Sequence, residues 1–270
     1  MSRLRLVLAF ALGVAGAGCA LLPDGTPLIR VLVFNIHAGK DAAGAPNLDG
    51  VAALVRSSNA DIVLLQEVDR HTRRSGGVDQ VQVLQEKTGF DAAFGRSLNY
   101  DGGQYGIAVL APRVATSLTA PLRVTPPQAR SGGSYEPRVA MTLTLPTAIG
   151  RLQAINTHLD ASAQEDYRLQ ESAEILQLVG RLSFRGLPLI AGGDFNAEPT
   201  SETYRRLTGG GLRDAWIECG AGDGLTYPAD KPIKRIDYVF LSAGIRCTKA
   251  EVIDTQISDH RPLLVTVTTQ

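Results

Sequence analysis

Short apolar runs bounded by turn-forming residues recur along the chain from residue 29 to residue 267. Runs of this length that are rich in valine, isoleucine and leucine are typical of β-strands. We expect strands at residues 29–36, 62–65, 107–110, 139–145, 152–157, 187–191, 236–241 and 263–267.

Two of the intervening segments have the apolar spacing of amphipathic helices. The first face carries Leu48, Ala52 and Val55, and the second carries Leu169, Ala173, Leu176 and Val179. The expected strands 139–145 and 152–157 are joined by a turn too short for a crossover helix, so they must be antiparallel if they pair directly. Two mixed sheets packed face to face, with helices on the outside, satisfy this α+β layout.

The amino-acid composition is that of a folded globular protein. With 44% hydrophobic residues, the chain of 270 residues can bury a substantial core, and it shows no internal repeat or second domain boundary. Its 27 basic and 27 acidic residues balance, so no global positive field gathers nucleic acid onto the surface. We therefore expect one monomeric globular domain, and a nucleic-acid substrate is disfavoured without being excluded.

The first residues of the chain have the pattern of an export signal. Arg3 and Arg5 precede the apolar run 6–12, which is too short to span a bilayer comfortably. The segment Gly16-Ala17-Gly18-Cys19 resembles a bacterial lipobox, although Gly16 stands where leucine is usual. That resemblance implies cleavage before Cys19, lipidation of Cys19 and attachment to a membrane. The alternative is an ordinary signal peptide in which Cys19 has no role.

This interpretation divides the chain into a lipoprotein-type signal peptide (1–18), a tether (19–28) and one domain (29–270). The protein would be exported to a bacterial cell envelope and anchored on its periplasmic or outer-membrane face. Disulfides persist in that compartment, and Cys219 and Cys247 are the two cysteines besides Cys19. A disulfide and two buried free thiols both stay open, because the sequence gives no distance between their Cα atoms.

Polar residues stand where several of the predicted strands end. Asn35, Glu67 and His158 each follow an apolar run. A carboxylate after a strand that is apolar on both faces needs a cation or a salt-bridge partner. An amide and an imidazole can hold water or donate to a phosphate, although each taken singly is also common as a hydrogen-bonded structural residue.

Two later motifs carry further chemistry. Gly193-Asp194-Phe195-Asn196 follows a predicted strand, and residues two apart on an extended chain point the same way. We therefore expect Asp194 and Asn196 to face one site, the alternative being an Asx-type turn that leads into the next helix. Asp237 lies among core residues, and Asp259 and His260 precede the last strand. If Asp237 reaches the far nitrogen of His260, it fixes the tautomer of that imidazole.

Taken in order, these motifs resemble the endonuclease/exonuclease/phosphatase superfamily, and the likeness extends over residues 29–267. The resemblance implies a DNase I-like four-layer α/β/β/α sandwich of two mixed, mainly antiparallel sheets. It also implies a Mg²⁺ or Mn²⁺ cofactor bound at one edge. On this resemblance Glu67 and Asn35 are metal ligands, and Asp259 is a further metal or histidine contact. Asp194 and Asn196 position the nucleophile or leaving group, and His158 contacts the phosphate. His260 is the general base or transition-state donor, with Asp237 as its orienting partner.

Further segments offer substrate contacts. Tyr105 lies in a stretch that resembles a strand of the family, although Ile107 stands where asparagine is frequent. Arg138, in Glu136-Pro137-Arg138, suits a phosphate, with a surface ion pair as the alternative. His37 either lines the pocket or ends its strand. The basic loop 70–74 either overhangs the pocket to bind a second phosphate or a lipid headgroup, or is a solvated loop.

These observations predict a metal-dependent hydrolase of a phosphodiester or phosphomonoester. A lipid headgroup, a small molecule and nucleic acid all remain candidate substrates. A lipoprotein on the same fold that binds a phosphorylated ligand without turnover is the alternative.

Overall fold

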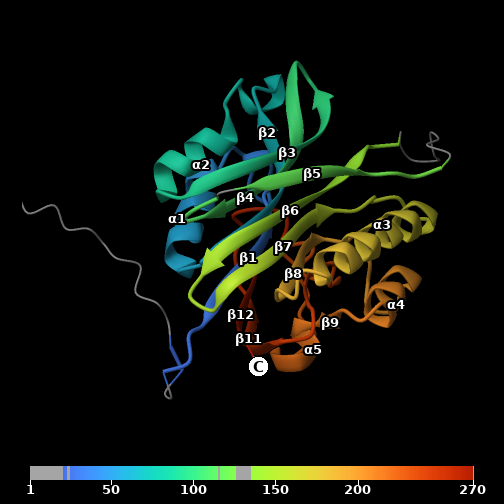
Figure 1. Cartoon of the computed structure of the whole chain (residues 1–270). Coiled ribbons are helices and arrows are strands. Elements are labelled where there is room, and N and C mark those ends of the chain that lie inside the picture. Colours follow the sequence, from blue (N-terminus) through green and yellow to red (C-terminus); the bar gives the residue numbers. More distant parts are fainter. Residues whose placement is uncertain (1–20, 23–24, 115, 126–134, 270) are drawn as a thin grey trace, which may run out of the picture.

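Two six-stranded sheets pack face to face in the computed structural model, which describes residues 21–22, 25–114, 116–125 and 135–269 (Figure 1). The first sheet has the order β11 (Ile245–Val252), β12 (Leu263–Thr269), β1 (Ile29–Asn35), β2 (Ile62–Arg70), β4 (Gly103–Ala111) and β3 (Asp91–Tyr100). The second has the order β5 (Ser117–Leu122), β6 (Arg138–Thr147), β7 (Gly150–His158), β8 (Leu189–Asp194), β10 (Asp237–Leu241) and β9 (Arg213–Asp214).

Each sheet contains one parallel pair among antiparallel neighbours. β1 pairs parallel with β2, and β7 pairs parallel with β8, while the other strand pairs are antiparallel. The predicted antiparallel pairing of 139–145 with 152–157 is confirmed as β6 with β7. The expected mixed, mainly antiparallel sandwich is therefore confirmed.

Helices cover the outer faces of both sheets. The apolar stripes predicted from the sequence lie on α1 (Leu48–Ser58) and α3 (Asp166–Ser183). α1 and α2 (Gln80–Thr88) pack on the first sheet, and α3 with α4 (Glu202–Gly209) packs on the second (Figure 1). The shorter elements are α5 (Ala215–Cys219), η1 (His37–Gly39) and η2 (Arg73–Ser75).

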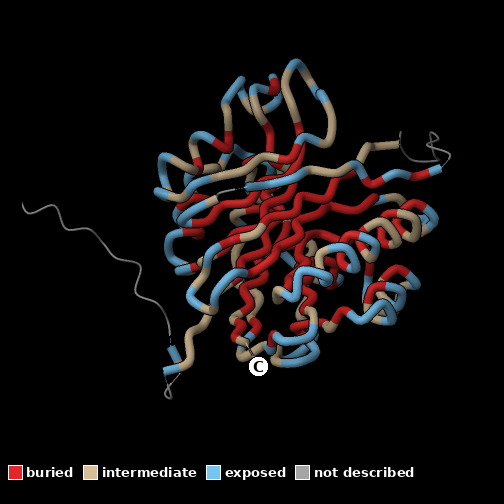
Figure 2. Tube along the Cα trace, viewed as in Figure 1, coloured by how far each residue is buried: buried red, intermediate tan, exposed pale blue. Residues whose placement is uncertain are grey.

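The largest apolar cluster lies between the two sheets. It includes Val31 and Val33 of β1 on one side and Met141 and Ala154 of the second sheet on the other, all fully or almost fully buried. Figure 2 shows the central strands as the buried interior and the helices with exposed outer surfaces. Burial of both faces explains why the central strands read as continuous apolar runs.

Several elements were not predicted. β3 and β5 are edge strands with small or polar residues and, in β5, Pro121, so neither shows a regular apolar alternation. β9, β11, α2, α4 and α5 were also missed, because they are short or have mixed polarity. None of these elements ends in one of the predicted site residues.

A disulfide joins Cys219 at the end of α5 to Cys247 in β11, with their Cα atoms 5.8 Å apart. It resolves the alternative that the sequence left open.

The predicted signal peptide and Cys19 lie outside the described residues. Within the described part of the chain, no helix is both long enough and apolar enough to cross a bilayer.

Candidate active site

Glu67 reaches the site through an irregularity in β2. The register between β2 and β4 shifts between Leu65 and Val68, which is a β-bulge, and Glu67 within it has the left-handed φ of 56°. A residue other than glycine pays a conformational cost for that angle. The bulge turns the Glu67 side chain out of the strand's regular alternation, and Glu67 lines a cavity of about 930 Å³.

Asn156 of β7, in the opposite sheet, supports this bulge. Its side-chain amide donates to the carbonyl oxygens of Leu65 at 3.0 Å and of Ala108 at 2.8 Å, and its Oδ1 accepts from Gln66 Nε2 at 2.7 Å. Buried carbonyl groups that leave a strand ladder need other donors. Asn156 supplies them across the interface between the sheets.

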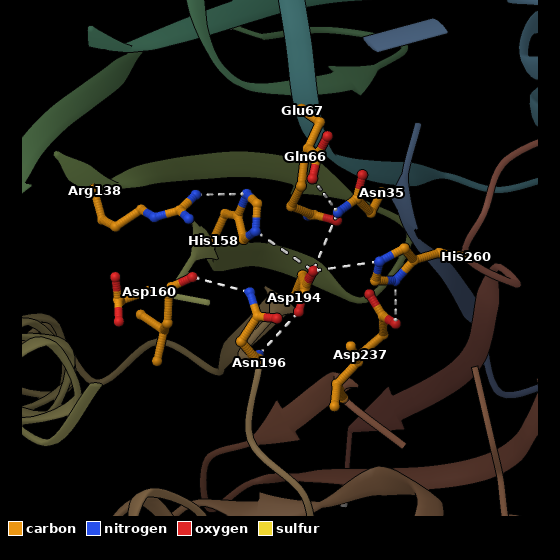
Figure 3. A network of polar contacts seen from close by, with 12 residues as sticks. Asn35, Gln66, Glu67, Arg138, His158, Asp160, Asp194, Asn196, Asp237 and His260 are labelled. Carbon is orange, nitrogen blue, oxygen red and sulfur yellow. Dashed lines mark hydrogen bonds and ion pairs between the residues drawn. The ribbon is translucent and has the colours of Figure 1, made fainter. Parts of the chain in front are cut away.

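Asn35 joins the two carboxylates at the ends of the parallel strand pairs. Its Nδ2 donates to Glu67 Oε1 and to Asp194 Oδ2, both at 3.1 Å. Its Oδ1 accepts from the backbone N–H of His37 at 3.1 Å. Asn35 thus acts as a donor that draws Glu67 of the first sheet and Asp194 of the second together (Figure 3), while its Oδ1 keeps a second lone pair for a further partner.

The expectation of an extended chain through Asp194 and Asn196 was wrong. Asn196 has a left-handed φ of 48°, and its N–H donates to Asp194 Oδ1 at 2.9 Å, which is the Asx-type turn that had been the alternative. Asn196 Nδ2 also donates to the carbonyl oxygen of Leu159 at 3.0 Å. Both Asp194 and Asn196 nevertheless line the same cavity.

Asp237 and His260 form a buried pair. Asp237 Oδ2 lies 2.9 Å from His260 Nδ1. Burial disfavours the charged imidazole, but the charge and hydrogen bond of Asp237 outweigh it and raise the pKa of His260 to about 10. The ring of Tyr227 packs against His260 at 4.8 Å between centroids. His260 is therefore held by its Nδ1, and its Nε2 points toward Asp194.

His158 is held in the opposite protonation state. Arg138 Nη1 lies 3.0 Å from His158 Nδ1, and because a guanidinium group only donates, Nδ1 must be the acceptor. The remaining proton is then on Nε2. Burial, with the charges of Arg138 and His260, holds the pKa of His158 well below its usual value. His158 is a neutral imidazole that presents an N–H donor.

The two imidazoles flank one carboxylate oxygen. Asp194 Oδ2 lies 3.5 Å from His158 Nε2 and 3.7 Å from His260 Nε2 (Figure 3). Burial and the neighbouring charge of Asp237 raise the pKa of Asp194 to about 7, while His260 opposes that shift. Two donors and a carboxylate at these separations can orient a water molecule or a phosphoryl oxygen between them.

The other predicted residues lie at different places around this centre. Tyr105 and Asp259 line the cavity, as does Arg138, which also contacts Glu136 Oε1 at 2.9 Å. Asp259 Oδ1 lies 3.8 Å from His37 Nδ1. His37 is not among the lining residues, although its backbone orients Asn35.

The charges of the basic loop are paired in the structure. Arg70 contacts Asp79 at 2.6 Å, Arg73 contacts Asp101 at 2.9 Å, and Arg74 contacts Asp69 at 2.7 Å. Arg74 alone of these arginines lines the cavity.

The arrangement suits a hard cation. Glu67, Asp194 and Asp259 line the same cavity, and carboxylate oxygens are ligands that Mg²⁺ and Mn²⁺ prefer. Asp194, Asp237 and His260 also place ligand atoms within 4.8 Å of one another. Asp237 Oδ1 is buried without a hydrogen-bond partner. A bound cation would offset this concentration of negative charge, so the residues present fit a divalent metal.

Comparisons with known proteins identify the family of this chain. The model of the endonuclease/exonuclease/phosphatase family matches residues 32–260. The chain belongs to this family. The match includes every predicted site residue from Asn35 to His260, and the family's name denotes enzymes that act on phosphoester bonds.

Two curated proteins are similar to this chain in sequence. The chain is 28% identical to an inositol phosphosphingolipids phospholipase C of Schizosaccharomyces pombe over 207 residues, which cover 72% of this chain and 47% of that protein. It is 27% identical to human nocturnin over 215 residues, or 70% of this chain and 48% of that protein. The chain thus spans about half the length of the curated relatives it matches.

A solved structure shows the shared fold. The mannosyl-6-phosphatase of Bacteroides thetaiotaomicron superposes with a TM-score of 0.74, covering 88% of this chain and 99% of that chain at 20% identity.

Two features of this family member were missed in the sequence. Asn156 is a polar residue inside the apolar run 154–157, and that inward amide was the available signal. Tyr227 lies in an irregular segment, so nothing in the sequence pattern placed it beside His260.

Proposed function

We propose that this chain is a divalent-metal-dependent hydrolase of a phosphodiester or phosphomonoester. The observation that carries the proposal is the convergence of Glu67, His158 and His260 around Asp194, from both sheets, in one cavity. The relatives' printed names, which include a phospholipase C and a phosphatase, support phosphoester chemistry.

In the proposed mechanism, Glu67 and Asp259 would hold the cation, with Asp194 adjacent. When bound, the cation neutralises charge on the phosphoryl oxygens and the leaving group. We infer Mg²⁺ or Mn²⁺ from the oxygen ligands.

The chain's own groups would orient the reactants. Asp194, fixed by Asn35 and by the N–H of Asn196, positions the attacking water. The neutral imidazole of His158 donates its Nε2 proton as a hydrogen bond to a phosphoryl oxygen. Asp194 would also accept the proton that the water loses as it attacks. His260, oriented by Asp237, would give its Nε2 proton to the leaving-group oxygen as the bond to phosphorus breaks.

We further propose that the protein is exported and attached to a membrane through a lipidated Cys19. The support is the sequence pattern of the first residues, in which a short apolar run leads to Gly16-Ala17-Gly18-Cys19. Labelling with a radioactive fatty acid in a bacterial host, with Cys19→Ser as the control, tests this part. Equal labelling of both proteins would contradict it.

Hydrolysis of bis-p-nitrophenyl phosphate by the full chain tests the catalytic proposal. Turnover should require Mg²⁺ or Mn²⁺ and should stop with a chelator. Glu67→Ala and His260→Ala should each nearly abolish it, while Glu86→Ala, an exposed change on α2, should retain it. Ordinary activity in either site variant would refute the assignment. Phosphate-ligand binding without any turnover would favour the non-catalytic alternative.

A further inference from the structure

We propose that the cavity selects the phosphate ester of a neutral polyhydroxy group, such as a sugar or a cyclic polyol, over a polynucleotide. This inference rests on the proposed hydrolase function and names its substrate class. It follows from the charges, hydroxyl groups and unpaired acceptors that line the cavity of about 930 Å³ around Asp194.

The charge of the lining is unsuited to a polyanion. Among the described residues, six carboxylates line the cavity against four arginine and lysine side chains and two imidazoles, those of His158 and His260. The carboxylates belong to Glu67, Glu136, Glu165, Asp194, Glu198 and Asp259, and the four arginine and lysine side chains to Arg74, Arg138, Arg168 and Lys234. One bound divalent cation would serve a single reacting phosphate, whereas each additional phosphate of a polynucleotide needs its own cationic contact.

The arginines of the lining are already committed. Arg74 donates to both carboxylate oxygens of Asp69, at 2.7 and 2.8 Å. Arg138 contacts Glu136 and His158. Arg168 Nη1 donates to the backbone carbonyl oxygens of the loop that follows β7. The described lining therefore holds no row of free cations that could follow a phosphate backbone.

Hydroxyl groups are concentrated instead. Four of the seven tyrosines of the chain, namely Tyr100, Tyr105, Tyr135 and Tyr227, line the cavity, while none of the described phenylalanines does. The aromatic side chains that line the cavity are thus all ones that carry a hydroxyl. A tyrosine can stack its ring on the C–H face of a sugar and exchange hydrogen bonds through its hydroxyl.

These tyrosines come from different elements of the cavity wall. Tyr227 packs on His260, and Tyr105 lies on β4 beside the bulge that carries Glu67. Tyr100 is 43% exposed, and its ring lies under the guanidinium of Arg74 at 4.7 Å. The hydroxyls of Tyr100, Tyr105 and Tyr227 have no hydrogen-bond partner among the described residues. They are therefore available to a ligand.

Glu198 supplies an unpaired acceptor in the same cavity. It follows Asn196 by two residues, lines the cavity and forms no ion pair within the described part of the chain. A free carboxylate accepts strongly from alcohol hydroxyls, and it repels a second phosphate placed beside it. Both effects favour a polyol carrying one phosphate.

The test uses substrate pairs that differ only in the polyol. With Mg²⁺, the full chain should hydrolyse glucose 6-phosphate with a kcat/KM about tenfold or more above that for ethyl phosphate, which lacks hydroxyls. For a lipid source, phosphatidylinositol in phosphatidylcholine vesicles is compared with phosphatidylethanol in the same vesicles. An advantage in the soluble pair identifies a free polyol phosphate, and an advantage only in the vesicle pair identifies a lipid headgroup.

Two conservative variants examine the lining itself. Glu198→Ala and Tyr100→Phe should each lower the ratio of polyol substrate to its matched control by about threefold to tenfold, mainly through KM, because each removes one hydrogen-bonding group. Glu86→Ala, which removes an exposed carboxylate outside the cavity, should leave that ratio as it is. A ratio that stays constant in both lining variants would overturn the inference.

Assaying an oligodeoxynucleotide as a further substrate distinguishes a failure of the proposed substrate class from a failure of the proposed hydrolase function. If the oligonucleotide is cleaved with a higher kcat/KM than either polyol substrate, the substrate class is wrong and the hydrolase proposal stands. If bis-p-nitrophenyl phosphate shows no chelator-sensitive turnover, the hydrolase proposal itself fails.

Discussion

Replacing Asn156 with leucine should destabilise the fold and impair the site together. The variant keeps a similar volume but loses three buried hydrogen bonds, to Leu65 O, Ala108 O and Gln66 Nε2. Each buried group left without its partner costs roughly 1–3 kcal/mol, and allowing for relaxation we expect a total of about 4 kcal/mol. In a domain of this size that loss lowers Tm by roughly 10 °C.

The catalytic effect should exceed what partial unfolding explains, because the lost donors support the bulge that presents Glu67. We expect kcat/KM for bis-p-nitrophenyl phosphate, measured well below Tm, to fall about tenfold or more as Glu67 is misplaced. The matched control is Gln153→Leu on the same strand. Gln153 is fully buried too, but it donates one hydrogen bond, to Leu182 O, away from the bulge.

Urea unfolding and calorimetry of Asn156→Leu, Gln153→Leu and the parent chain measure the expected losses of stability. The control should lose about 1 kcal/mol and keep its activity. If Asn156→Leu melts within about 3 °C of the parent and turns over normally, the bulge does not depend on the opposite sheet and the reasoning is refuted.

Three more predictions come from other parts of the molecule. Asp237→Asn should lower kcat by roughly a thousandfold or more, because the amide cannot hold His260 in its tautomer and charge state. A loss of kcat below about tenfold would contradict the pairing of Asp237 with His260. The two cysteines of the Cys219–Cys247 disulfide are 28 residues apart in the sequence, and reducing this disulfide should lower the free energy of unfolding by about 3–4 kcal/mol. Thiol counting on the denatured, unreduced protein should find neither of these two cysteines free. Burial raises the pKa of Glu171 to about 7, although the N–H of Asp160, which donates to this carboxylate, opposes the shift. The stabilisation from this group is therefore fully present below pH 4.5 and is lost as the pH rises through 7, and Glu171→Gln should remove roughly 3 kcal/mol of the pH dependence of the unfolding free energy. Parallel pH–stability curves for the variant and the parent chain would contradict this prediction.

The central strands could be predicted from the sequence because both of their faces are buried. Ile62–Leu65 is one apolar run for that reason, and the charged residue Glu67 that follows it is easily recognised as a candidate site residue. Edge strands such as β3 carry no such contrast, since one face and one edge meet solvent. The ends of buried strands were therefore predictable, and the outer strands were not.

The orientation of side chains within the site was less predictable than their identity. Asn196 was expected to lie on an extended chain, yet the backbone turns there with a left-handed φ. The pairing of Arg138 with His158 also has no local signal, because the residues are 20 apart and meet only when β6 pairs with β7. Long-range pairing decides which nitrogen of His158 keeps its proton.

The two histidines show why that pairing matters for the proposed chemistry. Asp237 outweighs the cost of burial and raises the pKa of His260 to about 10, whereas burial and Arg138 hold that of His158 well below its usual value. One sequence thus provides a cationic and a neutral imidazole on either side of Asp194 Oδ2. Opposite protonation states in neighbouring groups are how one site separates a charged proton donor from a fixed hydrogen-bond donor. The roles proposed for His260 and His158 follow from their different neighbours, since the imidazole rings themselves are identical.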